Sequence, residues 1–208
     1  PAAPLFSQIL SSFRIFNLKP VLATLTLLVI LGGALTFTKN SLPGDLLYPI
    51  KRVVEKSQAV LLSEKDKPNL NLEMANKRLE ELTKIAKTNQ VKKLAPALQE
   101  YQSSLAEAAK NIARVAATTS DSILITKIAG EIQKLEKNRA ILEKTYGIAG
   151  LASEEEANPA KIIVEWLIED IEKRTLTEKQ ALLFEGAKED YKNGDYSLAL
   201  EKILNLNQ

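Results

Sequence analysis

Cysteine and histidine are both missing from this sequence of 208 residues. Without them the chain has no thiol nucleophile, it lacks the usual zinc and haem ligands, and it lacks the side chain that most often acts as a general base near neutral pH. No disulfide can form, so packing alone must hold the fold together. We therefore predict no catalytic residue, no metal site and no cofactor.

Aromatic residues and glycine are scarce, and residues 39–208 carry no net charge. Aromatics make up 5% of the chain and there are 8 glycines, a composition that favours long helices over a β-sandwich. Residues 1–38 contain no acid and only Arg14 and Lys19 as bases, which leaves 26 basic and 26 acidic residues for the rest. This balance gives no electrostatic basis for binding nucleic acid, so none is predicted as a partner.

One long hydrophobic run is present, VLATLTLLVILGGALTFT, at residues 21–38. Its 18 uncharged residues would form a helix of about 27 Å, close to the roughly 30 Å of a bilayer's hydrocarbon core. Pro20 suits the first turn of such a helix. We predict a transmembrane helix over residues 20–38, a single-pass protein of the cell membrane, and the lipid bilayer as a partner. A cleaved signal peptide is the alternative, but no small-x-small cleavage site follows the run.

The segment before this helix and the bases around it bear on orientation. Residues 1–19 form a juxtamembrane segment whose apolar residues recur at helical spacing, so it is either an interfacial helix or an unstructured tail. The bases after the predicted span outnumber Arg14 and Lys19, and this count alone favours a cytoplasmic body. Those downstream bases are Lys39, Lys51, Arg52 and Lys56.

Residues 39–150 show helical patterns separated by short breakers. Helices are predicted at about 49–63, 68–89, 90–118 and 121–146. In the last three, apolar residues recur every three or four positions, and the links between them are short. These features predict an antiparallel bundle with heptad-type packing. The third stripe opens at Val91, and Pro96 marks a kink or a late first turn.

Residues 151–208 are predicted to form a separate three-helix subdomain. The boundary is GIAGLASEEEAN at 147–158, with two glycines and an acidic run that we interpret as a loop and not as a calcium site. Helices are predicted at 159–174 and, after a capping-box pattern at Thr177, up to 192. The final segment, 187–204, resembles the hairpin of a tetratricopeptide repeat, and a packing hairpin is favoured over a peptide-binding groove.

The stretch SLPGDLLYPIKR, residues 41–52, is predicted to redirect the chain as it leaves the bilayer, through a turn at Pro43-Gly44 and a helix start at Pro49. Tyr48 suits either the headgroup level or the base of the bundle, and the bases that follow would meet phosphates or lie on a solvated face. This membrane-exit motif consists of Pro43, Gly44, Asp45, Leu47, Tyr48, Pro49 and Lys51.

At this motif the chain resembles a bacterial family of single-pass membrane proteins whose extracytoplasmic helical domain has no known function. The residues that carry the resemblance are N-S-L-P-G-D-x-L-Y-P-x-K at 40–51, M-A-x-K-R-L-E-E-L at 74–82, T-L-T-x-x-Q at 175–180 and N-G-D-Y-x-x-A-L-E-K-I at 193–203. The resemblance implies a body outside the cytoplasm, against the charge count. It supplies no catalytic residues.

The sequence thus predicts an all-α protein that is not an enzyme. We expect a protein–protein interaction module or an accessory subunit of an envelope complex, whose partner is another envelope or membrane protein or a second copy of the chain. The alternative is a sensor or an anti-sigma-like signalling transducer. Trp166, Phe184 and Tyr196 are the candidate partner surface, unless they pack the last three helices together.

Overall fold

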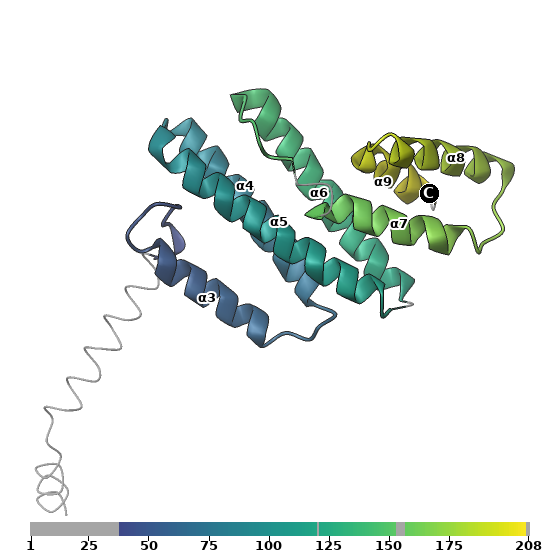
Figure 1. Cartoon of the computed structure of the whole chain (residues 1–208), viewed down its shortest axis with the longest axis horizontal. Coiled ribbons are helices and arrows are strands. Elements are labelled where there is room, and N and C mark those ends of the chain that lie inside the picture. Colours follow the sequence, from purple (N-terminus) through teal and green to yellow (C-terminus); the bar gives the residue numbers. More distant parts are fainter. Residues whose placement is uncertain (1–37, 120, 153–156, 207–208) are drawn as a thin grey trace, which may run out of the picture.

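The computed structural model describes residues 38–119, 121–152 and 157–206, and their regular elements are all helical (Figure 1). The prediction of an all-α protein is confirmed for this part of the chain. The helices are α3 (Tyr48–Val60), α4 (Lys67–Lys87), the 3-10 helix η2 (Val91–Lys93), α5 (Leu94–Ala116), α6 (Ser122–Tyr146), α7 (Pro159–Ile171), α8 (Glu178–Lys192) and α9 (Tyr196–Asn205).

The predicted juxtamembrane segment 1–19 and all of the predicted span 20–38 except Thr38 lie outside the described residues. Among the residues that are described, no helix is both long enough and apolar enough to cross a bilayer.

Local signals in the sequence explain where the helices begin and end. The Asp121 side chain accepts hydrogen bonds from two backbone amides of α6, and Asn158 does the same for α7. Thr177 and Gln180 form the predicted capping box of α8. Pro96 lies in the first turn of α5, where its missing amide proton costs nothing, so the prediction of a late first turn is confirmed.

Helices α4 to α7 form a four-helix bundle. Helix α4 packs against α5 and α6, and α7 packs against the same two helices, which closes the bundle. Helix α9 packs on α6 and α7 and pairs with α8, and α3 lies beside the bundle (Figure 1). Helix α7, which follows the predicted division at residue 150, packs on α5 and α6 and completes the bundle that the preceding helices begin.

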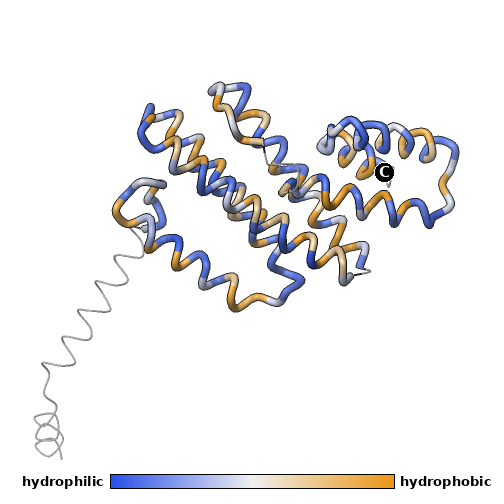
Figure 2. Tube along the Cα trace, viewed as in Figure 1, coloured by the Kyte–Doolittle hydropathy of each residue, from blue (hydrophilic) through white to orange (hydrophobic). Residues whose placement is uncertain are grey.

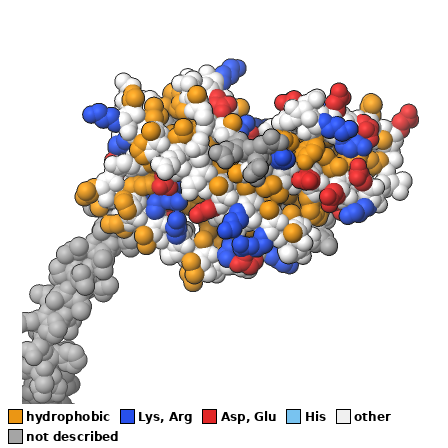
Figure 3. All heavy atoms as spheres, viewed as in Figure 1, with side chains coloured by type: hydrophobic (Ala, Val, Ile, Leu, Met, Phe, Trp, Pro, Cys, Tyr) orange, Lys and Arg blue, Asp and Glu red, His pale blue; other side chains and the backbone are white. Residues whose placement is uncertain are grey.

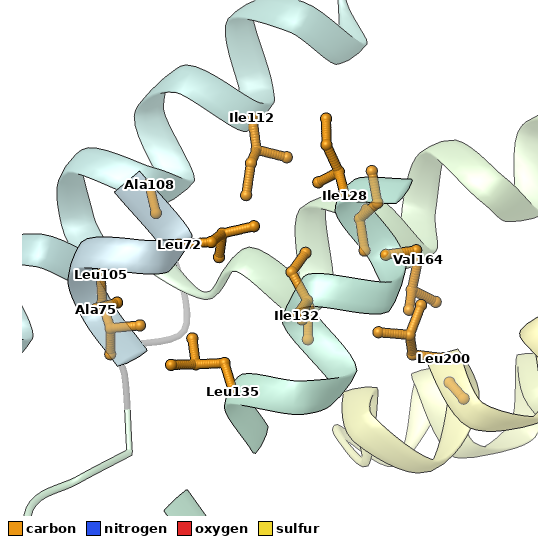
Figure 4. Packing of buried hydrophobic residues seen from close by; sticks show 14 of the residues in the cluster. Leu72, Ala75, Leu105, Ala108, Ile112, Ile128, Ile132, Leu135, Val164 and Leu200 are labelled. Atoms are coloured by element: carbon orange, nitrogen blue, oxygen red, sulfur yellow. The ribbon is translucent and has the colours of Figure 1, made fainter. Parts of the chain in front are cut away.

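One hydrophobic core runs through this arrangement. Leu72 of α4, Ile112 of α5, Ile132 of α6 and Val164 of α7 converge, and the core continues to Leu200 of α9 (Figure 4). Each fully buried aliphatic side chain of this kind contributes about 1.5 to 3 kcal/mol. Two details of the predicted apolar stripes are wrong. Val91, the first residue of the third stripe, is exposed. At the end of α4 the stripe continues through Ile85, which is fully buried, and not through Ala86, which is only half-buried.

The link between α6 and α7 is held against the bundle. Gly147 ends α6 in a left-handed conformation with φ 63°, which favours glycine. Leu151 is then fully buried in the core, and Gln102 of α5 donates a hydrogen bond to the Gly150 carbonyl at 3.1 Å. The predicted boundary is therefore a packed connection over its first half, and Glu154–Glu156 lie outside the described residues.

Candidate functional site

Residues Ser41 to Lys51, which we call the elbow, connect Thr38 to α3. The elbow contains a turn in which the Asp45 amide donates to the Leu42 carbonyl at 2.9 Å and the Leu42 amide donates to Asp45 Oδ2 at 2.8 Å. Gly44 in this turn has φ 90°, a conformation that side chains rarely adopt. The predicted turn is confirmed, and the Asp45 side chain closes it.

The elbow is fixed to the bundle at the start of α5. Lys93 Nζ lies 2.5 Å from Asp45 Oδ1, and this hydrogen bond is the main reason that the pKa of Asp45 is lowered. A Cβ at Gly44 would lie 3.4 Å from Lys93 Cγ, so backbone and side chain are already in contact there. Leu42 and Pro43 are buried, whereas Pro49 is exposed in the first turn of α3. Leu47, the residue before the helix, is half-buried.

Four charged side chains join α3 to α4 in a buried group that we call the charge cluster: Lys51, Glu55, Arg78 and Glu81. Lys51 Nζ lies 2.5 Å from Glu81 Oε1, and Arg78 Nη1 lies 2.7 Å from the same oxygen. Arg78 also pairs with Glu55 and is 0% exposed. Because two positive charges meet two negative ones, the cluster is neutral and can be buried without an uncompensated charge.

Tyr48 covers the charge cluster. The Arg78 guanidinium carbon lies 5.5 Å from the centre of the Tyr48 ring and Lys51 Nζ lies 5.8 Å from it, both within the range of cation–π attraction. Burial raises the pKa of the Tyr48 hydroxyl, so this group stays protonated at physiological pH. Tyr48 is therefore buried inside the protein, against the middle of α4.

The predictions for Lys51 and Arg52 are wrong. Lys51 was expected either to meet phosphates or to lie on a solvated face, but it is buried against Glu81. Arg52 Nε lies 2.8 Å from Glu100 Oε2 of α5. Both bases therefore act within the protein as links from α3 to the bundle.

The charge cluster was not predicted from the sequence, although a signal for it exists. Lys51 and Glu55 are four residues apart, and Arg78 and Glu81 are three apart, so each pair lies on one side of its helix. The spacing cannot show that the two pairs face each other. Glu80, the neighbour of Glu81, is exposed, so the two adjacent acids lie on different sides of α4.

Of the three predicted partner-surface residues, Trp166 lies at a groove. The groove has a volume of about 460 Å³ and runs between α6, α7 and α9. Ile123 of α6, which is 82% exposed, lines it together with Trp166, and Arg174 adds a positive charge. Trp166 itself is half-buried and packs against the core.

The other two residues lie elsewhere. Phe184 is buried in the core, so for this residue the packing alternative holds. Tyr196 is half-buried at the turn between α8 and α9, where its ring meets that of Tyr191 edge to face at 5.5 Å. Lys161 Nζ lies 5.9 Å from the centre of the Tyr196 ring. The three residues therefore do not form one surface.

The described residues thus define an all-helical protein whose bundle is joined to its N-terminal elbow by buried ion pairs. The chain belongs to the family DUF5667, a domain of unknown function, which matches residues 40–145. The predicted resemblance to a domain of unknown function is confirmed over this range, from the elbow to the last turn of α6. No curated protein and no solved structure matches the chain.

Within the described residues, no group of acidic side chains is arranged to hold a metal ion.

Proposed function

We propose that this chain is a single-pass membrane protein whose helical body lies outside the cytoplasm and binds another envelope protein, or a second copy, without catalysing a reaction. The observation that carries the proposal is the uncharged run at residues 21–38, which leads directly into the elbow. Such a run has the length of a membrane helix, and a body fixed to its end is held close to the bilayer.

The orientation rests on the family resemblance and not on the charge count. Of the four bases that follow the run, Lys51 pairs with Glu81 and Arg52 with Glu100, so both belong to the folded body. The positive-inside rule is counted over short loops, and long domains cross the membrane largely regardless of their charge. The excess of bases after the run therefore does not determine where the body lies, and the family resemblance favours the outside.

The groove beside Trp166 is the proposed binding surface. Aromatic side chains are enriched where proteins bind one another, and exposed apolar residues next to them are typical of such sites. Trp166 and Ile123 supply both features. Lys127 and Arg174, the latter already paired with Asp170, offer positive charge to an acidic group at the rim. The partner expected from this lining is a helix or loop with an apolar residue and an acid.

Two measurements test the proposal. Protease added to the outside of intact cells should cleave the body, whereas protection from outside would contradict the orientation. Gentle detergent extraction followed by pull-down should recover a complex, and Ile123→Asp should abolish its recovery. Leu182→Asp on α8 is the matched control, because Leu182 is 77% exposed and does not line the groove. Recovery of monomer alone, or an equal effect of both changes, would overturn the binding function.

A further inference from the structure

Helix α3 exposes its hydrophobic side and buries its charged side. Tyr48, Lys51 and Glu55 face the bundle. The opposite side is mostly apolar, with Ser57 as an exposed polar residue within it, because residues three and four apart lie on one face of a helix. Figure 1 places α3 at the lower edge of the molecule, Figure 2 colours several of its residues as hydrophobic, and in Figure 3 hydrophobic side chains lie at this edge among charged ones. The exposed residues of this outer face, including its two ends, are Leu46, Ile50, Val53, Val54, Val60 and Leu61.

Basic residues lie on both flanks of this outer face. Lys56 is the one exposed charged side chain of α3. On the other flank, Lys39 and Lys77 line a hollow of about 540 Å³ beside Val54. The only acid of α3, Glu55, is buried in the charge cluster. An apolar face with basic flanks is typical of a helix that lies in the headgroup region of an anionic membrane.

The elbow holds α3 next to the end of the hydrophobic run. Thr38 is the last residue of that run, and the Ser41 amide donates to its carbonyl at 3.1 Å. Lys51 Nζ donates to the Ser41 carbonyl at 2.9 Å. Ser41 therefore bonds both to the last residue of the run and to Lys51 of α3, so the helix lies close to the point where the run ends.

We propose that the outer face of α3 binds the lipid bilayer, with α3 lying along the interface, its apolar residues among the upper acyl chains and its flanking lysines at anionic headgroups. The inference rests on the membrane anchor of the proposed function. It favours lipid over a second copy, because two such faces would bring like-charged flanks together. The hydrophobic run that ends at Thr38 also favours lipid, because a run of this length would span a bilayer and would place the elbow at the bilayer surface.

The experiment uses spin labels on single cysteines, which the cysteine-free chain allows. The full chain is reconstituted in vesicles of phosphatidylcholine and phosphatidylglycerol, with one label at Val53→Cys, Leu182→Cys or Leu28→Cys. Val53 is 69% exposed on α3, and Leu182 is an exposed apolar residue of α8, so neither change disturbs the core. Leu28 lies in the hydrophobic run and reports whether the anchor is inserted. Collisions with oxygen report lipid, and collisions with a water-soluble nickel chelate report water.

If α3 binds lipid, the label at Val53 collides with oxygen and loses its collisions with the nickel chelate, as does the label at Leu28, while the label at Leu182 stays accessible to the chelate. A label at Val53 in water, with Leu28 in lipid, would overturn this inference alone and leave the anchor intact. Labels at both positions in water would overturn the anchor as well. Dipolar broadening between labels at Val53 would identify a second copy as the occupant and would also overturn the inference.

Discussion

Single residues decide how α3 is attached, and Arg78 is the most consequential of them. Its guanidinium is fully buried and bonds to acids from two helices. Replacing Arg78 with methionine keeps much of its volume but leaves Glu55 and Glu81 with less positive charge. We expect Arg78→Met to lower the free energy of unfolding by about 3 to 5 kcal/mol, measured by urea denaturation.

Lys77 provides the matched control for Arg78. It lies next to Arg78 in sequence and 3.5 Å from Glu55, but its side chain is 43% exposed. Lys77→Met should therefore change stability by no more than about 1 kcal/mol, as exposed ion pairs do. Equal losses for the two variants would contradict the importance of burial in the charge cluster.

Asp45 gives the elbow a dependence on pH. In the folded protein, the hydrogen bond from Lys93 lowers the pKa of the Asp45 carboxyl below its ordinary value of 3.8. A carboxylate whose pKa is lowered by folding stabilises the protein above its unfolded pKa, and this contribution is lost as pH falls through the folded pKa. From about pH 5 downward, the parent chain should therefore lose more stability than Asp45→Asn.

The Asp45 prediction has its own control in Lys93. Removing the main hydrogen-bond donor by Lys93→Met should bring the Asp45 pKa back toward its ordinary value, as an NMR titration of the carboxyl carbon would show. If Asp45→Asn and the parent chain instead responded identically to acid, Asp45 would have no role in holding the elbow.

At the scale of elements, two glycines should respond to the same substitution with opposite signs. Gly44 has φ 90° in the elbow, whereas Gly130 is exposed within α6 and a Cβ there would meet no atom within 4 Å. Gly44→Ala should destabilise the protein by about 1 to 2 kcal/mol because of backbone strain. Gly130→Ala should stabilise it by about 0.5 to 1 kcal/mol because alanine favours a helix. Thermal unfolding of the two variants checks both signs, and a shift in the same direction for both would contradict the prediction.

Most element boundaries could be predicted because their causes are local. Asp121, Asn158 and Thr177 each bond amides within three residues of themselves, so the sequence alone reveals them. The orientation of α3 could not be predicted in this way. A sequence pattern predicts that the charged side of a helix faces water. In α3 the charged side faces the bundle instead, because residues of opposite charge on α4 and α5 pair with Lys51 and Arg52. The burial of Leu151 was missed for a related reason: a single residue in a loop has no periodicity.

At the scale of the whole molecule, the hydrophobic core extends further along the chain than the region that matches the family. The match ends at residue 145, but the four-helix bundle needs α7, and its core continues into α9. Sequence patterns identified the helices, but they could not show which helices pack together, because long-range contacts leave no local trace. The groove at Trp166 depends on the same long-range packing, which is why only one of its residues was predicted.

A shared core predicts cooperative unfolding. The fluorescence of Trp166, the sole tryptophan, reports on α7, and far-UV circular dichroism reports on all helices. We expect the two signals to change at the same urea concentration, as two-state unfolding requires. A chain ending at Gly150 would expose the core faces of α5 and α6, and we expect it to lose the sharp transition. Two separate transitions in the full chain would contradict a single core.

The bond between Lys51 and the Ser41 carbonyl also determines how the protein responds to mechanical force. Tension applied to the N-terminal end of the chain reaches Ser41 after Thr38, and Lys51 passes this load to Glu81 in the middle of α4. Helix α3 is thereby bypassed and is not the first element to be stretched. In a single-molecule pulling experiment, Lys51→Met should let the elbow and α3 extend at a lower force than in the parent chain, before the bundle ruptures.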